Sequence, residues 1–297
     1  MKNIIIILVI ILMSCSENDK FCDALGKEYQ IDILKNIEYS KDLWLDLYKP
    51  KKLGDYLKPI IILAHGMGDT KEAEDLTFHC RKLAHLGFVV ASIGWSPPTP
   101  FSIDSTLYFQ TGIQPIVDFQ KAMAFFLTDA RNENQFQIDT TNIFIGGSSF
   151  GAITSMHIGF VDSLQEFPNA FGKEIEGQGI NNSLWQQHQQ KVKGVINLAG
   201  WIWDTAFLDS NDPGLISIHG ENDELIPFNS DTAAINNIKI MLVYGPGSIH
   251  KKLNELKITN DLFVVPNGGH VSYYESQWRD STSHRVYNFL KTLTCDQ

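Results

Sequence analysis

The sequence predicts an α/β protein with a mostly parallel central sheet and helices on both faces, and three observations support this fold class. Short apolar runs alternate with amphipathic segments from about residue 59 onward. The runs are rich in β-branched residues and apolar on both alternations, as in strands buried on both faces. An earlier segment shows a two-residue alternation instead, which is typical of an antiparallel edge strand.

Six apolar runs are expected to form the parallel strands. They cover residues 59–65, 87–93, 142–145, 192–198, 215–218 and 262–265. The alternation lies in residues 37–48, where leucines at every second position alternate with Trp44, Asp46 and Tyr48. This segment predicts one half-buried antiparallel strand at the N-terminal edge of the sheet.

Helical patterning separates these runs, as expected when helices cover both faces of a parallel sheet. The predicted helices cover residues 71–86, 115–130, 150–164, 247–256 and 283–293. Two stretches fit neither pattern: residues 96–112 carry three prolines, and residues 162–190 are polar and rich in glutamine. Both are expected to be long loops that face the substrate, and residues 162–190 form a possible partial cap.

The first residues predict export. Residues 1–14 have the basic start and short apolar run of a signal peptide. The sequence LMSC that ends at Cys15 resembles a bacterial lipobox, which implies lipidation of Cys15 and anchoring to a bacterial membrane, at the outer membrane or cell surface. An ordinary secretory signal is the alternative and would give a periplasmic or secreted protein. Residues 15–30 would then be a lipidated linker, and residues 31–297 one folded domain.

The charge of the chain limits its partners. Asp and Glu (34) outnumber Lys and Arg (24), which gives a formal net charge of −10. Such a chain repels nucleic acid and anionic lipid surfaces, so the only membrane contact we expect is the lipid anchor. No HExxH, CxxC or clustered-carboxylate pattern indicates a metal, and we expect no cofactor.

Three cysteines remain if Cys15 carries lipid. Cys22 and Cys295 flank the predicted domain, and the ends of a domain often lie close together. A disulfide between them is therefore a hypothesis for an exported chain. Cys80 is expected to be a small core residue.

The sequence GGSSFGA, residues 146–152, follows a predicted strand and opens a predicted helix. A Gly-x-Ser-x-Gly pattern in this context predicts a nucleophile elbow with Ser149 at its tip. Ser148 lacks the spacing, because Gly146 and Phe150 are its neighbours at two positions either side. Glycines at 147 and 151 are expected because side chains there would collide with neighbouring elements.

A serine nucleophile needs a base, and the base needs a carboxylate. Asp223 and His270 each follow a predicted strand, and the chain order Ser149, Asp223, His270 is the order found in α/β-hydrolases. For the acid, the alternatives are Glu221, Glu224 and Asp204, which also follow strands. For the base, His65 and His219 follow strands as well, where a histidine more often braces a loop.

Four segments together resemble those of α/β-hydrolase-fold carboxylesterases. They are HGMGD at 65–69, GGSSFGA at 146–152, HGENDELIP at 219–227 and GGH at 268–270. The likeness covers residues 37–293, and segments before the last two predicted strands are similar to those of secreted and polyhydroxybutyrate-depolymerase-like esterases. The resemblance implies the α/β-hydrolase fold and ester hydrolysis by Ser149, His270 and Asp223 through an acyl-enzyme.

An esterase of this kind also needs two backbone donors for the oxyanion. The residue after the nucleophile is Phe150, and the loop after the first parallel strand places Met67 where a second donor should be. Met67 departs from the HGGG form of this loop. Four aromatic residues follow strand ends and are candidates for pocket walls: Trp201, Trp203, Trp95 and Tyr273.

The expected function is hydrolysis of a small-molecule or glycan-linked carboxylic ester by a serine esterase. A serine peptidase or an acyltransferase would use the same residues. A surface lipoprotein that binds without catalysis is the alternative from another class, and it would be favoured if the three predicted residues lay apart.

Overall fold

The computed structural model describes residues 17–96, 105–235 and 238–295. An eight-stranded sheet forms its centre, with strands in the order β1-β2-β4-β3-β5-β6-β7-β10. All pairs from β4 to β10 are parallel, and β1 and β2 form an antiparallel edge. The predicted fold class, an α/β-hydrolase fold with an antiparallel N-terminal edge, is confirmed.

The strands of this sheet are β1 (Ile31–Ser40), β2 (Leu43–Pro50), β3 (Lys58–Ala64), β4 (Val89–Ile93), β5 (Ile138–Ser148), β6 (Val192–Leu198), β7 (Gly214–Gly220) and β10 (Asn260–Val265). Strands β8 (Ser230–Ile235) and β9 (Ile238–Tyr244) pair as a separate antiparallel hairpin. The helices are α1 (Glu17–Ala24), α2 (Glu74–His85), α3 (Ser105–Arg131), α4 (Phe150–Phe160), α5 (Asn169–Gly177), α6 (Asn182–Gln189), α7 (Pro246–Leu256) and α8 (Arg279–Cys295), with short 3-10 turns η1 (Thr205–Phe207) and η2 (Ser272–Tyr274).

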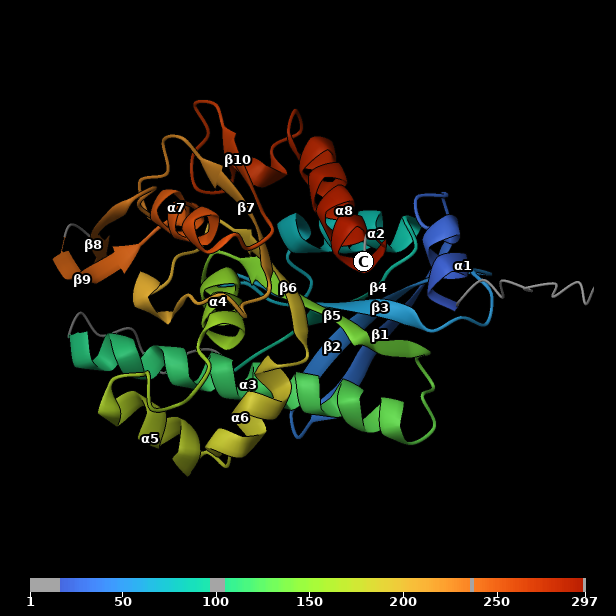
Figure 1. The fold of residues 1–297 in the computed structure, drawn as a ribbon, viewed down its shortest axis with the longest axis horizontal. Coiled ribbons are helices and arrows are strands. Elements are labelled where there is room, and N and C mark those ends of the chain that lie inside the picture. Colours follow the sequence, from blue (N-terminus) through green and yellow to red (C-terminus); the bar gives the residue numbers. More distant parts are fainter. Residues whose placement is uncertain (1–16, 97–104, 236–237, 296–297) are drawn as a thin grey trace, which may run out of the picture.

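Two groups of helices cover the two faces of the sheet. Helices α2 and α8 lie above the sheet in Figure 1, and α3, α5 and α6 lie below it. Strand β3 is buried along its whole length because alternate residues face opposite cores. Ile60 and Ile62 pack in the core under α3 and α4, whereas Ile61 and Leu63 pack in the core under α2 and α8. Burial on both faces explains why this strand reads as an unbroken apolar run.

The predicted single edge strand over residues 37–48 is wrong. The chain turns at Asp42, which has a φ of 60°, and forms the β1–β2 hairpin. Strand β2 then runs antiparallel to β4, with Leu45 paired to Ile93. The beginning of β2 therefore lies next to the C-terminal ends of the parallel strands.

Helix α3 begins ten residues before the predicted start, and residues 105–112 are helical, although the sequence predicted a loop over 96–112. Pro115 lies inside this helix, whereas proline is usually found at a helix start. Residues 162–190, expected to be a loop or partial cap, hold α5 and α6, which both contact α3. The β8–β9 hairpin was not predicted.

The ends of the described chain are joined. Cys22 of α1 and Cys295 of α8 form a disulfide, as hypothesised, and the two helices contact each other. Cys80 is a buried free cysteine, as predicted. Residues 1–16 lie outside the described residues, so the signal peptide, the lipidation of Cys15 and export stay predictions. Within the described part of the chain, no helix has both the length and the apolar composition to cross a membrane.

A buried acid lies just before β7. The side chain of Asp212 is 8% exposed, and its Oδ2 accepts a hydrogen bond of 2.8 Å from the Asp209 N–H. Burial raises the pKa of Asp212 to about 8, and the nearby acids Asp209, Asp162 and Glu166 add to the increase. In the folded chain this carboxyl therefore keeps its proton at pH values where it is ionised in the unfolded chain.

We expect Asp212→Asn to make stability less dependent on pH. Between about pH 4 and pH 8, the folded chain holds a proton that the unfolded chain has released, so the wild type loses stability as the pH rises. Asparagine removes this loss and still accepts the Asp209 hydrogen bond. The melting temperature of the variant should exceed that of the wild type by more at pH 8 than at pH 5. Asp231→Asn, at an exposed position, is the control and should melt like the wild type at both pH values. If the melting temperature of Asp212→Asn differs from that of the wild type by the same amount at pH 5 and pH 8, the prediction is wrong.

Candidate active site

Ser149 lies between β5 and α4 in a strained backbone conformation. Its φ of 50° and ψ of −114° are rarely adopted by residues other than glycine. Its backbone N–H donates a 2.7 Å hydrogen bond to the Leu198 carbonyl at the end of β6. A strand, a strained serine and a helix in this order form the predicted nucleophile elbow.

The two glycines around Ser149 permit a close approach of β3. A Cβ on Gly147 would lie 2.2 Å from the Ala64 carbonyl oxygen, and one on Gly151 would lie 2.1 Å from the same atom. The carbonyl of His65 would also be only 2.7 Å from a Cβ on Gly151. The absence of both side chains therefore brings the end of β3, and the loop after it, against the elbow.

Ser149, His270 and Asp223 form one hydrogen-bonded chain. The Nε2 atom of His270 lies 2.8 Å from Ser149 Oγ, and its Nδ1 atom lies 2.8 Å from Asp223 Oδ2. Asp223 follows β7 and His270 follows β10, and these strands are parallel neighbours. The structure thus brings together the three residues that the sequence singled out, in the geometry of a serine nucleophile, a base and an orienting acid.

The carboxylate of Asp223 is buried and well coordinated. Its side chain is 1% exposed, and Oδ1 accepts hydrogen bonds of 2.9 Å from the N–H groups of Leu225 and Ile226. Burial alone would raise the pKa of Asp223. The hydrogen bond and charge of His270, together with the two backbone donors, outweigh burial and lower that pKa. Asp223 is therefore held as an anion that favours the Nδ1–H tautomer of His270.

The alternative acids have other partners. Glu221 accepts a 2.9 Å hydrogen bond from the Asn267 N–H, so it braces the loop that carries His270. Asp204 caps the turn η1 through the Ala206 N–H. Among the described hydrogen bonds of His270, the only carboxylate is that of Asp223. Glu224 lies in the same loop as Asp223 but contributes no described bond to His270.

The alternative bases are also engaged elsewhere. His65 stacks on Trp95 with ring centroids 4.8 Å apart, and its Nδ1 lies 2.8 Å from the Gly66 carbonyl. His219 Nε2 lies 3.1 Å from the Ile226 carbonyl and 3.8 Å from Asp223. Burial lowers the pKa of both histidines, so both are neutral braces of their loops.

The predicted oxyanion donors lie in segments that meet at Ser149. Phe150 is the first residue of α4, where a backbone N–H has no partner within the helix. Met67 belongs to the loop after β3; a Cβ on its neighbour Gly66 would lie 3.5 Å from Ser149 Cβ. Within the described residues, neither N–H donates to a backbone acceptor outside a helix or strand. The structure thus brings both segments to the nucleophile, as an oxyanion site formed by Met67 and Phe150 requires.

Trp95 connects these two segments. Its ring stacks on His65 and lies 5.6 Å from the ring of Phe150, and its Nε1 donates a 3.3 Å hydrogen bond to the His65 carbonyl. Trp95 is 7% exposed and borders a cleft on the β2 side of the loop. This predicted pocket residue therefore also holds the loop that carries Met67.

Trp201 and Trp203 line an apolar hollow next to the elbow. The hollow is bordered on α4 by Phe150 and His157, and on the inserted helix α5 by Phe171. Trp203 packs edge-on against Phe171 with ring centroids 4.7 Å apart. The structure therefore places the tryptophan pair at a cavity wall, and residues 162–190 contribute to the same wall.

Tyr273 does not lie at such a wall, contrary to the sequence prediction. Its side chain is 2% exposed in the core between the sheet and helices α2 and α8. Its hydroxyl donates a 2.8 Å hydrogen bond to Asp75. The position after His270 favoured a pocket role, but η2 turns the ring inward.

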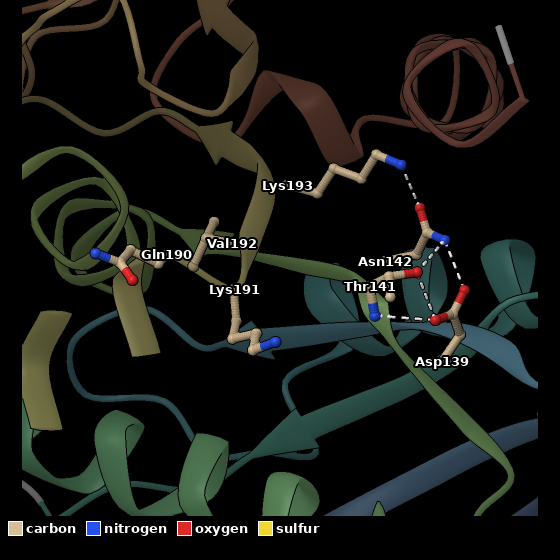
Figure 2. Close-up of a pocket in the computed structure, with 7 residues that line it drawn as sticks. All are labelled: Asp139, Thr141, Asn142, Gln190, Lys191, Val192 and Lys193. Carbon is tan, nitrogen blue, oxygen red and sulfur yellow. Dashed lines mark hydrogen bonds between the residues drawn. The ribbon is translucent and has the colours of Figure 1, made fainter. Parts of the chain in front are cut away.

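A second hollow lies at the opposite end of the sheet, near the beginnings of β5 and β6 (Figure 2). There Lys193 donates a 2.6 Å hydrogen bond to Asn142, which donates to Asp139. These polar groups satisfy one another, and the end of β5 that carries Ser149 is remote from them. No group of three or more possible metal-ligating residues occurs in the part of the chain that the structure describes.

Sequence reasoning missed two residues at this end of the sheet, Asp69 near the elbow and Trp44 on β2. The Oδ2 of Asp69 lies 3.2 Å from the position of a Cβ on Gly66, next to Ser149. Trp44 is 42% exposed and borders the cleft on the β2 side. Asp69 was visible as the last residue of HGMGD, and Trp44 as an outward residue in the leucine alternation. Neither position indicated that β2 runs toward the active site.

Comparison with solved structures supports the fold. A truncated carbohydrate esterase from gut microbiota matches with a TM-score of 0.60 at 17% identity, covering 90% of this chain and 98% of that one. An esterase of the Planctomycetes species Thermogutta terrifontis matches with a TM-score of 0.60 at 14% identity, covering 89% and 91%. A dienelactone hydrolase from Anabaena variabilis matches with a TM-score of 0.53 at 13% identity, covering 88% and 97%. No curated protein sequence matches the chain significantly.

The sequence comparison identifies the family. The family model described as BD-FAE matches residues 45–204, which is more than half of the chain. The matched segment contains the HGMGD loop and Ser149 but ends before Asp223 and His270. With the fold and the arrangement of these residues described above, the chain belongs to the BD-FAE family of α/β-hydrolase esterases.

Proposed function

We propose that this chain hydrolyses carboxylic esters through a covalent acyl-enzyme on Ser149. One observation carries the proposal: Ser149 Oγ, the His270 ring and the Asp223 carboxylate form a continuous chain with two hydrogen bonds of 2.8 Å. These three hydrogen-bonded residues, together with the strained elbow and two nearby backbone donors, supply the groups that acyl transfer needs.

In the first half of the reaction, Ser149 Oγ bonds to the ester carbonyl carbon, and its proton moves to His270 Nε2. Asp223 stabilises the imidazolium through its bond to Nδ1–H. The N–H groups of Met67 and Phe150 donate to the oxyanion of the tetrahedral intermediate. Collapse of the intermediate breaks the bond to the alcohol oxygen, which takes the proton from Nε2.

In the second half, water attacks the acyl carbon while His270 Nε2 accepts a proton from the water. The second tetrahedral intermediate then releases the carboxylic acid, and the proton returns to Ser149. The apolar hollow at Trp201 and Trp203 borders Phe150, so it lies beside one oxyanion donor. Its free volume of about 20 Å³ admits little more than one methyl-sized group, so we assign it to a short acyl group such as acetyl.

The test compares Ser149→Ala with Ser148→Ala in a purified chain that keeps the Cys22–Cys295 disulfide. The two serines are adjacent, but only Ser149 bonds to His270, so we expect turnover of 4-nitrophenyl acetate, butyrate and octanoate to be lost in Ser149→Ala and retained in Ser148→Ala. Paraoxon should release one equivalent of 4-nitrophenolate and leave a diethylphosphoryl group on Ser149, measured by peptide mass spectrometry. The preference among the three chain lengths measures the size of the acyl hollow.

Turnover that survives in Ser149→Ala, or a folded wild type that neither hydrolyses these esters nor takes the phosphoryl label, would overturn the proposal. The second result would favour a binding lipoprotein without catalysis. Turnover of a 4-nitroanilide faster than that of the matched ester would favour a peptidase. Preferential transfer of the acyl group to an added alcohol in water would favour an acyltransferase.

A further inference from the structure

His157 is a buried polar residue in the wall of the apolar hollow. It lies on α4, the helix that begins at Phe150, and its side chain is 2% exposed. Its ring centroid lies 4.6 Å from that of Trp203 and 5.7 Å from that of Trp201. A buried polar side chain among aromatic rings is stable only where its hydrogen-bonding atoms have partners within the protein.

Both ring nitrogens of His157 have a backbone partner, and together these partners define one tautomer. Nδ1 lies 2.7 Å from the carbonyl oxygen of Ile153, one turn earlier in α4. A carbonyl oxygen can only accept, so Nδ1 carries the ring proton. Nε2 then accepts a 3.2 Å hydrogen bond from the Trp203 N–H. Burial lowers the pKa of His157 to about 4, which keeps the ring neutral and Nε2 an acceptor at neutral pH.

The bond from Trp203 to His157 joins two walls of the hollow. Helix α4 forms one wall, and the tryptophan pair that follows β6 contributes to the other. Ile202, between the two tryptophans, exchanges backbone hydrogen bonds of 3.0 and 2.9 Å with Tyr244 of β9. That pair fixes the segment to the β8–β9 hairpin, whereas the bond to His157 holds Trp203 to the helix that follows the nucleophile.

The position of Trp203 affects the size of the hollow. Its ring packs against His157 of α4 and, at a centroid distance of 4.7 Å, against Phe171 of α5. This packing leaves a free volume of about 20 Å³, which suits a methyl group. The further methylene groups of a longer acyl chain would overfill the hollow unless Trp203 moved. A bond that restrains Trp203 therefore also disfavours longer acyl groups.

We propose that His157 is a specificity-determining residue that limits the length of the acyl group by fixing Trp203 against α4. The inference rests on the proposed function for the identity of the acyl group that enters the hollow. His157 takes no part in proton transfer, because its two nitrogens bond to the backbone and the base of the reaction is His270. The preference for short acyl groups should then depend on a hydrogen-bond acceptor at position 157, and not only on the volume of the side chain there.

The test compares two substitutions of similar size. His157→Gln places a carbonyl oxygen near the position of Nε2 and can still accept from the Trp203 N–H, whereas His157→Leu supplies no acceptor. The measured quantity is the ratio of kcat/KM for 4-nitrophenyl acetate to that for 4-nitrophenyl butyrate, whose acyl chain is longer. We expect this ratio to fall about tenfold in His157→Leu and to stay within about twofold of the wild type in His157→Gln.

His157→Asn is the second variant, should His157→Leu not fold. Its amide can donate to the Ile153 carbonyl but has no atom at the position of Nε2, so the bond from Trp203 is lost and the ratio should fall as well. His79→Leu is the matched control. His79 is also a buried histidine, 2.8 Å from Ser283 Oγ, but it lies on α2 at the other face of the sheet. This variant should keep the wild-type ratio, and circular dichroism shows which variants have folded.

Phe171→Ala separates failure of this inference from failure of the acyl assignment. It removes the ring that packs against Trp203 on the α5 side and leaves His157 in place, so butyrate should gain relative to acetate. The inference is overturned if Phe171→Ala changes the ratio and the folded His157 variants do not, or if His157→Gln changes it as much as His157→Leu. It is also overturned if no variant at either position changes the ratio, because the hollow then does not hold the acyl group. In each of these cases, Ser149-dependent hydrolysis of 4-nitrophenyl acetate would leave the proposed function intact, whereas a folded wild type without turnover would reject both.

Discussion

Replacing Asp223 with asparagine is expected to lower kcat for 4-nitrophenyl acetate about 10⁴-fold. An asparagine amide would donate to His270 Nδ1, so Nε2 would carry the ring proton and could not accept the proton of Ser149. KM should change little, because the Asp223 side chain is 1% exposed and is covered by its own loop. Steady-state kinetics between pH 6 and pH 9 measure both quantities.

Glu221→Gln is the control for this prediction, because Glu221 belongs to the same loop and its carboxylate accepts a hydrogen bond from the Asn267 N–H, not from His270. A glutamine carbonyl preserves that bond, so kcat should be retained. A wild-type kcat in Asp223→Asn, or an equal loss in Glu221→Gln, would show that Asp223 does not orient the base.

Gly151→Ala is expected to destabilise the chain by more than about 4 kcal/mol, or to prevent folding. The added methyl group would lie 2.1 Å from the Ala64 carbonyl oxygen and 2.5 Å from its carbon. These are backbone atoms of the central strand β3, which cannot move without disturbing both β4 and β5. Thermal unfolding monitored by circular dichroism, with the yield of soluble protein, measures the effect.

Gly177→Ala provides the comparison. Gly177 ends α5, and nothing lies within 4 Å of a Cβ added there. This variant should be as stable as the wild type, since alanine has the higher helix propensity. If Gly151→Ala folds with a wild-type melting temperature, close packing of β3 against the elbow is not the reason why position 151 requires glycine.

Buried strands and the three triad residues could be predicted because local sequence determines them. Ser149 and Asp223 follow the buried strands β5 and β7, and His270 follows the half-buried edge strand β10, whose end is also apolar. Since parallel strands end at one edge of the sheet, Ser149, Asp223 and His270 were expected to meet without knowledge of any contact. The acid remained open among neighbouring carboxylates, because the choice between Asp223 and Glu221 depends on how one loop folds.

The features that the sequence did not predict depend on tertiary contacts. The leucine alternation continues across Asp42, so the hairpin turn was hidden within an apparently single strand. Pro115 marked a helix start by propensity, but α3 continues on its N-terminal side to Ser105. Tyr273 was expected at the pocket because it follows His270, but its side chain turns into the core. Trp44 was not expected there because it is distant in sequence, but antiparallel pairing of β2 with β4 brings it to the end of the sheet where the active site lies.

The bond between Cys22 and Cys295 has a mechanical consequence. The two half-cystines are 273 residues apart, and nearly all of the sheet and its helices lie within the covalent ring that they close. Tension applied across the two ends of the chain would pass through the sulfur–sulfur bond, and the enclosed residues would carry no load. Stretching the ends apart would therefore leave Ser149, Asp223 and His270 in place until that bond was reduced.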